Sequence, residues 1–227
     1  FPREPEYSDK VEKLRMEERL ARAKSGQGPK RIVESKHKLK WCSKCLYPSI
    51  SATPMEFDEE GVCMGCRHDE AKRKITSKEW SRRKQILIDI IEENKGKFNK
   101  DYDCIIAVGG GKDSYYQTHY VINELGYRPL LVTYYGNNFS PPGERNLRRM
   151  KEAFDADHII VFPSVELLKK LNRLGLIIMG DMNWHNHLGG ATTVHQVAVE
   201  KQIPVVIWGE HGYADLCGQF SMNDFIE

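Results

Sequence analysis

The 227-residue sequence has no long uninterrupted run of apolar residues. Stretches such as 105–108 and 205–208 are far shorter than the ~20 apolar residues that a transmembrane helix needs, so we expect no membrane span. The beginning of the chain also lacks a charged segment followed by an apolar one. We therefore expect no uncleaved secretory signal and a cytoplasmic location.

A general excess of basic residues is missing from most of the chain. Residues 1–40 have a charge balance of +5, whereas the remaining 187 residues have a balance of −3. Binding to a phosphate backbone normally demands a basic excess, so nucleic acid is not the expected partner of the main body. The basic arm at the start of the chain keeps that possibility open.

Composition and pattern divide the chain into three parts. Residues 1–36 are expected to form a basic helical extension, because the mixed charges and sparse apolar residues at 8–24 are typical of an exposed helix. Residues 37–75 contain four of the six cysteines among turn residues. Residues 76–227 are expected to form an α/β domain, which opens with a helix-capping box at 76–79.

The last part alternates between apolar runs and helical patterns. Strands are predicted at 103–108, 130–135, 158–162 and 205–208, and helices at about 113–125, 143–154, 164–174 and 191–201. Nearly continuous apolar strands are typical of a parallel sheet that helices cover on both faces. The expected fold class is therefore α/β, an open doubly wound parallel sheet with a small zinc-ribbon-like module before it.

Four cysteines form two Cys-x-x-Cys pairs. Cys42 and Cys45 are separated from Cys63 and Cys66 by seventeen residues, a spacing that fits one tetrahedral zinc ion. Disulfides are disfavoured in a reducing cytosol, and an iron–sulfur cluster remains an alternative. Because all four positions are cysteine, no coordination site is left for a reacting water. The zinc is expected to be structural.

The first predicted strand of the α/β part runs into a glycine-rich loop and then a helical pattern. The loop residues are Gly109, Gly110, Gly111, Lys112, Asp113 and Ser114. Glycines bring bare amides close to an anion, and the positive end of the following helix dipole points at the same place. This arrangement predicts a nucleotide phosphate site. The loop is neither a Walker loop nor a dinucleotide fingerprint, because both spacings are absent.

The loop resembles the PP-loop of ATP pyrophosphatases, commonly written Ser-Gly-Gly-x-Asp-Ser, with Gly109 in place of the usual Ser. From about residue 40 onward the chain resembles the N-acetyl sugar amidotransferase family, within the same superfamily of adenine nucleotide alpha hydrolase-like folds. Besides the cysteine module, the matching stretches are Phe57–Cys63, Tyr102–Asp103, Gly110–Tyr115, Gly136–Asn138, Lys169–Arg173, Gly180–His185 and Ile207–Glu210.

The resemblance implies an ATP- and Mg²⁺-dependent enzyme. It would adenylate the acetamido oxygen of a nucleotide-linked N-acetyl sugar and replace it with ammonia, giving an acetamidino sugar for surface polysaccharide (O-antigen). The sequence has no glutaminase signature, so the resemblance implies a separate HisH-like glutaminase that supplies the ammonia. Family members are usually longer, and we expect the α/β domain to continue beyond Glu227.

Roles are assigned to individual residues as expectations. Catalytic roles are expected for Lys112, Asp113, Asp181, His185 and Glu210. Nucleotide contacts are expected from the six loop residues, from Thr133 at the end of the second strand and from Gly209 after the last one. Substrate contacts are expected from Asn183, His187 and His211. Residues 181–190 are expected to be a loop that faces a cleft, although a second metal site or a hydrogen-bonded loop would also fit.

Two other functions remain open. A tRNA thiolation enzyme of the same superfamily would also combine cysteine pairs with a phosphate loop. It would need catalytic cysteines in the nucleotide domain, where only Cys104 and Cys217 are available. A nucleotide-binding module without catalysis is the other possibility, and Gly109 is the argument for it.

Overall fold

The computed structural model describes residues 39–50, 55–136 and 139–209, with Glu17, Glu18, Leu20, Ala21, Lys24 and Ser25. The chain divides into two compact units, one built around residues 94–207 and the other around 33–93. The domain boundaries expected from the sequence stay predictions. In the expected helix at 8–24, the described residues from 17 to 24 are helical.

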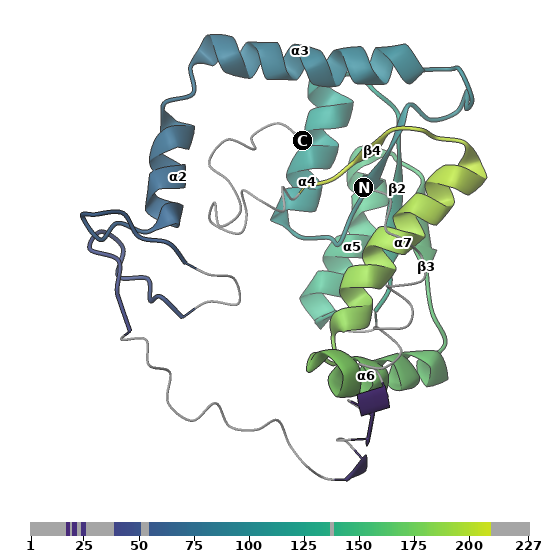
Figure 1. Ribbon diagram of the computed structural model, residues 1–227. Coiled ribbons are helices and arrows are strands. Elements are labelled where there is room, and N and C mark those ends of the chain that lie inside the picture. The colour runs from purple at the N-terminus through teal and green to yellow at the C-terminus, as the bar shows by residue number, and fades with distance from the viewer. Residues whose placement is uncertain are drawn as a thin grey trace, which may run out of the picture. The chain divides into compact units, whose positions relative to one another are not determined.

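A four-stranded parallel sheet forms the centre of the unit at 94–207 (Figure 1). Its strands are β1 Cys104–Ala107, β2 Pro129–Tyr134, β3 His158–Val161 and β4 Val206–Ile207, in the order β3-β2-β1-β4. All four predicted strands are confirmed to within one residue at each end. In the register, Ile106 lies between Leu131 of β2 and Ile207 of β4.

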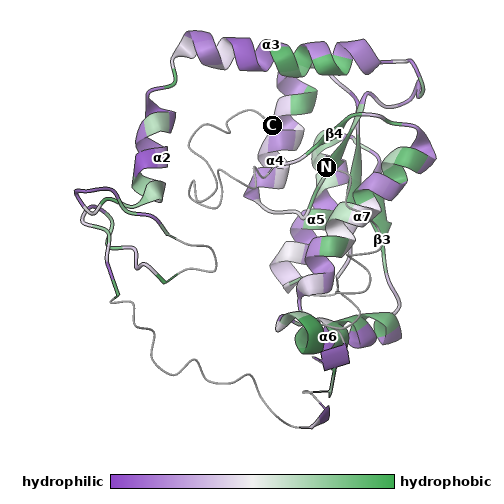
Figure 2. Cartoon of the chain, in the orientation of Figure 1, coloured by the Kyte–Doolittle hydropathy of each residue, from purple (hydrophilic) through white to green (hydrophobic). Residues whose placement is uncertain are grey.

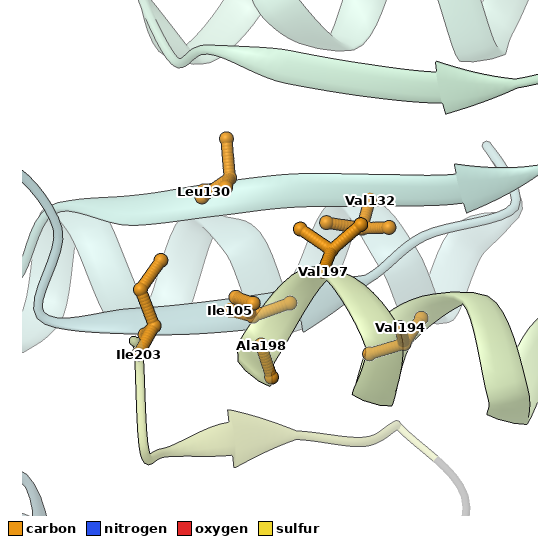
Figure 3. Close-up of a cluster of buried hydrophobic side chains, with 7 residues drawn as sticks. All are labelled: Ile105, Leu130, Val132, Val194, Val197, Ala198 and Ile203. Atoms are coloured by element: carbon orange, nitrogen blue, oxygen red, sulfur yellow. The ribbon is translucent and has the colours of Figure 1, made fainter. Parts of the chain in front are cut away.

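Helices cover both faces of this sheet. Figure 3 shows the face covered by α7, where apolar strand residues meet apolar helix residues. This buried cluster consists of Ile105, Leu130 and Val132 from the strands, Val194, Val197 and Ala198 from α7, and Ile203. Successive strand residues alternate between faces, so Cys104 and Ile106 face the other side, where α4 and α5 lie (Figure 1). The doubly wound arrangement is confirmed.

The helices of this unit depart from the expected bounds at two places. They are α4 Lys112–His119, continued by the π-helical turn η1 Tyr120–Glu124, then α5 Pro141–Phe154, α6 Val165–Met179 and α7 Trp184–Lys201. α6 runs five residues longer than predicted, through an apolar stretch, and ends at Gly180 in the left-handed conformation (φ +76°). α7 begins seven residues earlier than predicted, so residues 184–190 are helical rather than a loop.

Packing explains the early start of α7. The pair Gly189 and Gly190 lowers intrinsic helix propensity, which favoured a loop in the sequence. In the structure, an added Cβ at Gly189 would lie 2.5 Å from the ring of Tyr134. The glycine therefore lets the helix approach β2 closely. Intrinsic helix propensity depends on local sequence alone and does not include this tertiary contact.

The described residues of the unit around 33–93 form two helices, α2 Met64–Arg73 and α3 Ser77–Asn94. The capping box correctly predicted the start of α3: Thr76 Oγ1 accepts from the Glu79 amide at 3.3 Å. The Glu79 carboxylate does not close the box, because it pairs with Arg82 and Arg83 at 2.8 and 3.0 Å. Helix α2 was not predicted, since its residues are mostly polar and have little apolar periodicity.

None of the described helices combines the length and apolarity that crossing a membrane would require.

Candidate functional site

The strand order reverses at β1. The chain moves outward from β1 through β2 to β3, and then returns to place β4 on the opposite side of β1. In open α/β sheets, ligands bind at the carboxyl ends of strands where the strand order reverses. The glycine loop at 109–111 follows β1 at this reversal point.

The glycine loop is shaped by one close backbone contact. Gly110 is buried, has φ +75°, and an added Cβ would lie 2.8 Å from the Leu147 backbone of α5. Gly109 and Gly111 have open space around an added Cβ. Only Gly110 of the three therefore needs to be glycine for conformational reasons. The other two keep the loop surface bare.

The first turn of α4 closes the loop. Gly111 is the N-cap residue of α4 and makes no side-chain cap, so the amides of the first turn point toward the loop. The buried Ser114 hydroxyl accepts from the Gly109 amide at 2.9 Å, which fixes the two ends of the loop to each other. The result is a group of backbone amides at the positive end of a helix dipole.

Lys112 and Asp113 provide mobile charges at this surface. The Lys112 ammonium lies 2.8 Å from the Asp113 carboxylate, and their side chains are 88% and 67% exposed. An exposed pair of this kind is weak. Lys112 is therefore free to move onto an anion, and Asp113 onto a cation, at little energetic cost.

The carbonyl of Val108, just before the loop, is held from within the sheet. Thr133 is 3% exposed, and its hydroxyl donates to the Val108 carbonyl oxygen. His158 Nε2 lies 2.9 Å from the same hydroxyl and, since the Thr133 proton is already used, donates to it. We expected a nucleotide contact from Thr133. Its side chain binds the Val108 carbonyl just before the loop, and the nucleotide contact stays a prediction.

His158 was not singled out from the sequence, although a histidine in an otherwise apolar strand was a usable signal. Burial, with a smaller effect of the nearby Lys151 charge, lowers the pKa of His158 from 6.5 to about 4. The imidazole is thus neutral at pH 7, which matches its role as a donor to Thr133.

The polar cluster at 181–187 does not converge on one point, contrary to the expectation of a cleft-facing loop. Asp181 Oδ1 accepts from the Asn183 amide at 2.8 Å, and the Asn183 side chain accepts from Asn186, so Asp181 and Asn183 build the start of α7. His185 is buried, while His187 is exposed beside Trp184. Residues two apart on a helix point in different directions, which separates the two histidines.

His185 faces β2 instead. Its Nδ1 lies 3.3 Å from the Tyr134 hydroxyl, and the two rings meet edge to face at 6.2 Å. Tyr134 is the last residue of β2, so this pair lies at the same edge of the sheet as the glycine loop. His185 is therefore the one member of the predicted cluster that is directed toward the sheet.

The remaining predicted residues are only partly covered by the structure. Gly209 is exposed and lies two residues beyond β4. Glu210 and His211, together with Cys217, lie outside the described residues. Their expected roles stay predictions.

The four cysteines of the other unit form a compact cluster. Their sulfurs all lie within 4.8 Å of one another, with Cys42–Cys66 at 3.9 Å and Cys45–Cys63 at 3.7 Å. Thiolates that share one ion at ~2.3 Å lie about 3.8 Å from one another in a tetrahedron. Among the residues that the structure describes, no second group of potential metal ligands comes as close together.

Backbone contacts build the cluster before any metal is considered. The amides of Lys44, Cys45 and Cys63 donate to Cys42 Sγ at 3.3–3.4 Å. Burial opposes the charged form of Cys42, but these donors outweigh it and lower the pKa of that thiol to about 6. Burial and the neighbouring thiols raise the pKa of Cys66 to about 12. One sulfur is thus prepared as a thiolate, while another would need a metal to lose its proton.

Comparison with known proteins gives little further information. No family model and no curated protein sequence matches the chain. Among solved structures, the chain is similar to the U34-tRNA thiolase NcsA from Methanococcus maripaludis with its 4Fe-4S cluster. The TM-score is 0.26 and the sequence identity 13%, over 83% of this chain and 74% of that one. We draw no conclusion from a similarity with so low a TM-score, and we assign the fold from the sheet and helices described above.

We predict that Gly110→Ala lowers the free energy of unfolding by at least about 2 kcal/mol, because it combines an unfavourable left-handed residue with a backbone clash. Gly111→Ala is the matched control, since its added methyl meets no atom within 4 Å, and should cost less than about 1 kcal/mol. Urea unfolding of both variants measures the difference. Equal losses would mean that the Leu147 contact does not shape the loop.

A second prediction concerns His158 and pH. Because the folded pKa of about 4 lies below the ordinary 6.5, the unfolded chain binds a proton in this window that the folded chain does not. Stability should therefore fall as the pH falls from 6.5 to 4. His158→Gln keeps a donor for Thr133 and should flatten this dependence by on the order of 2 kcal/mol across the window. Urea unfolding curves with identical pH slopes for both proteins would contradict this assignment.

Proposed function

We propose that this chain is an ATP-dependent amidotransferase. It would bind ATP at the glycine loop, transfer AMP to the acetamido oxygen of a nucleotide-linked N-acetyl sugar, and exchange that oxygen for ammonia. The ammonia would come from a partner glutaminase of the HisH-like type. The product would be an acetamidino sugar of the kind used in surface polysaccharides.

The observation that carries the proposal is the glycine loop after β1, with the amides of the first turn of α4 beside it. It lies at the reversal point of a parallel sheet, at the first turn of α4, and next to an exposed lysine. These features together are suited to a triphosphate, because several amide donors and one mobile cation can share its charge. An added Cβ at Gly109 would meet no atom within 4 Å. The Ser that ATP pyrophosphatases usually have at this position would therefore fit there. The glycine found here in its place leaves the shape of the loop unchanged.

The chemistry requires an activated oxygen. An amide oxygen is a poor leaving group. When this amide oxygen attacks the α-phosphorus of ATP, an O–P bond forms. The bond between the α-phosphorus and the oxygen that bridges to the β-phosphorus breaks, and pyrophosphate is released. Ammonia then adds to the imidate carbon, the C–O bond breaks, AMP leaves, and loss of a proton gives the amidine. Each step needs the developing negative charge on phosphate oxygens to be stabilised.

The residues of the loop would divide this work. The amides of 110–111 and the Ser114 hydroxyl would hold the outer phosphates, while the Gly109 amide donates to Ser114. Lys112 would stabilise the negative charge that develops on the departing pyrophosphate. Asp113 offers an exposed carboxylate near the same place. It is a suitable ligand for Mg²⁺, which offsets the charge of the triphosphate when it is bound.

The alternative of a tRNA thiolation enzyme depends on a reactive cysteine. Cys104 is fully buried in β1, and burial, with a smaller contribution from Asp103, raises the pKa of its thiol to about 12. A buried thiol that keeps its proton is a poor nucleophile. Cys217 lies outside the described residues, so the assay described below must decide between the two activities.

We further propose that the cysteine cluster holds a single structural zinc ion. The sulfur separations of 3.7 and 3.9 Å suit one tetrahedral ion. In an iron–sulfur cluster the four thiolates are divided among at least two irons, so some of the sulfurs lie farther apart than around a single ion. Four cysteine ligands also leave no open position for catalysis.

The enzymatic proposal predicts the products. With ATP, ammonium and a UDP-linked acetamido sugar, the protein should release AMP and pyrophosphate. The sugar product should be lighter than the substrate by the mass difference between an oxygen atom and an NH group. Lys112→Ala should reduce AMP formation by roughly 100-fold or more, as removal of one charge-stabilising donor does. Mass spectrometry and a coupled pyrophosphate assay measure both.

Lys201→Ala serves as the control for that variant, because it removes an exposed lysine at the far end of α7. It should keep normal activity. Release of ADP, or turnover only with tRNA and a sulfur donor, would reject the amidotransferase. Unchanged AMP formation in Lys112→Ala would reject the loop as the nucleotide site.

The zinc proposal predicts one zinc per chain by elemental analysis of the purified protein. Removal by a chelator should unfold the unit around 33–93 and leave the sheet unit folded, because the cysteine loops have little other core. Circular dichroism and limited proteolysis with and without chelator report this. Iron in place of zinc, with a visible absorption band, would overturn the proposal.

A further inference from the structure

A cavity of about 460 Å³ lies between α6, α7 and the end of β2. Its two walls are helical stripes that face each other. Leu167, Leu171, Leu174 and Ile178 follow one face of α6, and His185, Leu188 and Thr192 follow one face of α7. These spacings of three and four residues are those of a single helix face. Figure 2 shows α6 as a largely hydrophobic helix.

Glycine contacts fix the walls of this cavity. Gly189 lets the Tyr134 ring lie against α7, since an added Cβ would approach that ring to 2.5 Å. Gly175 does the same for the turn between the helices, where an added Cβ would lie 2.7 Å from the Asp181 carbonyl oxygen. The space is therefore bounded by two close contacts at glycines, one with the Tyr134 ring and one with the Asp181 backbone. Its volume falls in the range of small-molecule sites.

Among the residues that the structure describes, no Asp, Glu, Lys or Arg side chain lines this cavity. An ionised ligand placed here would lose its hydration without gaining a charged partner, which is strongly unfavourable. The cavity is thus unsuited to phosphates and differs in chemistry from the glycine loop. An uncharged, mostly apolar ligand would bury its surface against the leucine stripes with no such penalty.

One polar pair lies in this apolar lining. Burial raises the pKa of the Tyr134 hydroxyl, so the phenol keeps its proton and can donate it to His185 Nδ1 across 3.3 Å. The imidazole then carries its own proton on Nε2. A buried histidine in this tautomer offers one N–H donor to a ligand that carries a carbonyl or hydroxyl oxygen.

We propose that this cavity is a binding site for an uncharged, largely apolar small molecule that carries one hydrogen-bond acceptor. The leucine stripes provide the binding area, and His185, positioned by Tyr134, recognises the acceptor. The site lies at the same edge of the sheet as the glycine loop but on the α7 face. It does not depend on nucleotide binding and goes beyond the amidotransferase proposal.

Three small probes test this site on the full chain without nucleotide. Benzamide is neutral and carries an acceptor, benzoate is its charged counterpart, and toluene lacks the acceptor. Benzamide should bind at least about tenfold more tightly than benzoate, and its ring protons should show nuclear Overhauser contacts to the methyl groups of Leu171 and Leu188. Titrations followed by NMR measure both.

Two variants locate the site. Leu171→Trp should fill the cavity and weaken benzamide binding at least about tenfold. Leu176→Trp is the matched control on the same helix, because Leu176 is 55% exposed and does not line the cavity; it should bind normally. His185→Phe should weaken benzamide but not toluene, and thermal melting of each variant checks that it folds.

Several outcomes would overturn the proposal. These are benzoate binding as tightly as benzamide, no effect of Leu171→Trp, or contacts from benzamide to residues elsewhere. The contacts are measured on the unaltered protein, so the test survives a variant that fails to fold. A concentration-dependent dimer in sedimentation that Leu174→Asp dissociates would show that a second copy covers this face, and would also reject the ligand site.

Discussion

The burial of the first three residues of β1 is the constraint on which the rest of the sheet unit depends. Cys104, Ile105 and Ile106 have no exposed surface, because parallel strands flank β1 on both edges and helices cover both of its faces. A strand held in this way ends at a fixed point. The position at which the glycine loop begins is fixed by the end of this strand. The Thr133 hydroxyl, which His158 supports, fixes the direction in which the chain leaves the sheet by binding the carbonyl of Val108.

Close contacts made possible by glycine shape both candidate sites of this unit. Gly110 brings the loop against the Leu147 backbone, and Gly189 brings α7 against Tyr134. At each glycine there is no room for a side chain, so a second element approaches the backbone closely. The first site presents amides, and the second presents apolar side chains with one histidine. The difference in chemistry follows from what lies beside the glycine, not from the glycine itself.

The order of the cysteine unit has a different physical origin. Its described loops bury little apolar surface, and its order comes from backbone amides that donate to Cys42 and from sulfurs gathered around one point. Such a module gains its stability from a metal rather than from a core. This separates the two proposals physically: removal of a metal would affect one unit, whereas the glycine loop is shaped by contacts within the other unit.

The sequence by itself determined the four strands, the glycine loop and the cysteine cluster. Continuous apolar runs, glycines before a helix and paired cysteines are local signals whose physical cause lies in the same few residues. Only the tertiary structure decided the start of α7, the buried role of Thr133, the partnership of His158 and the facing stripes of α6 and α7. Each of these depends on residues from separate elements that approach one another after folding, such as Gly189 and Tyr134. Local propensity at Gly189 favoured a loop, and close packing against β2 outweighed it.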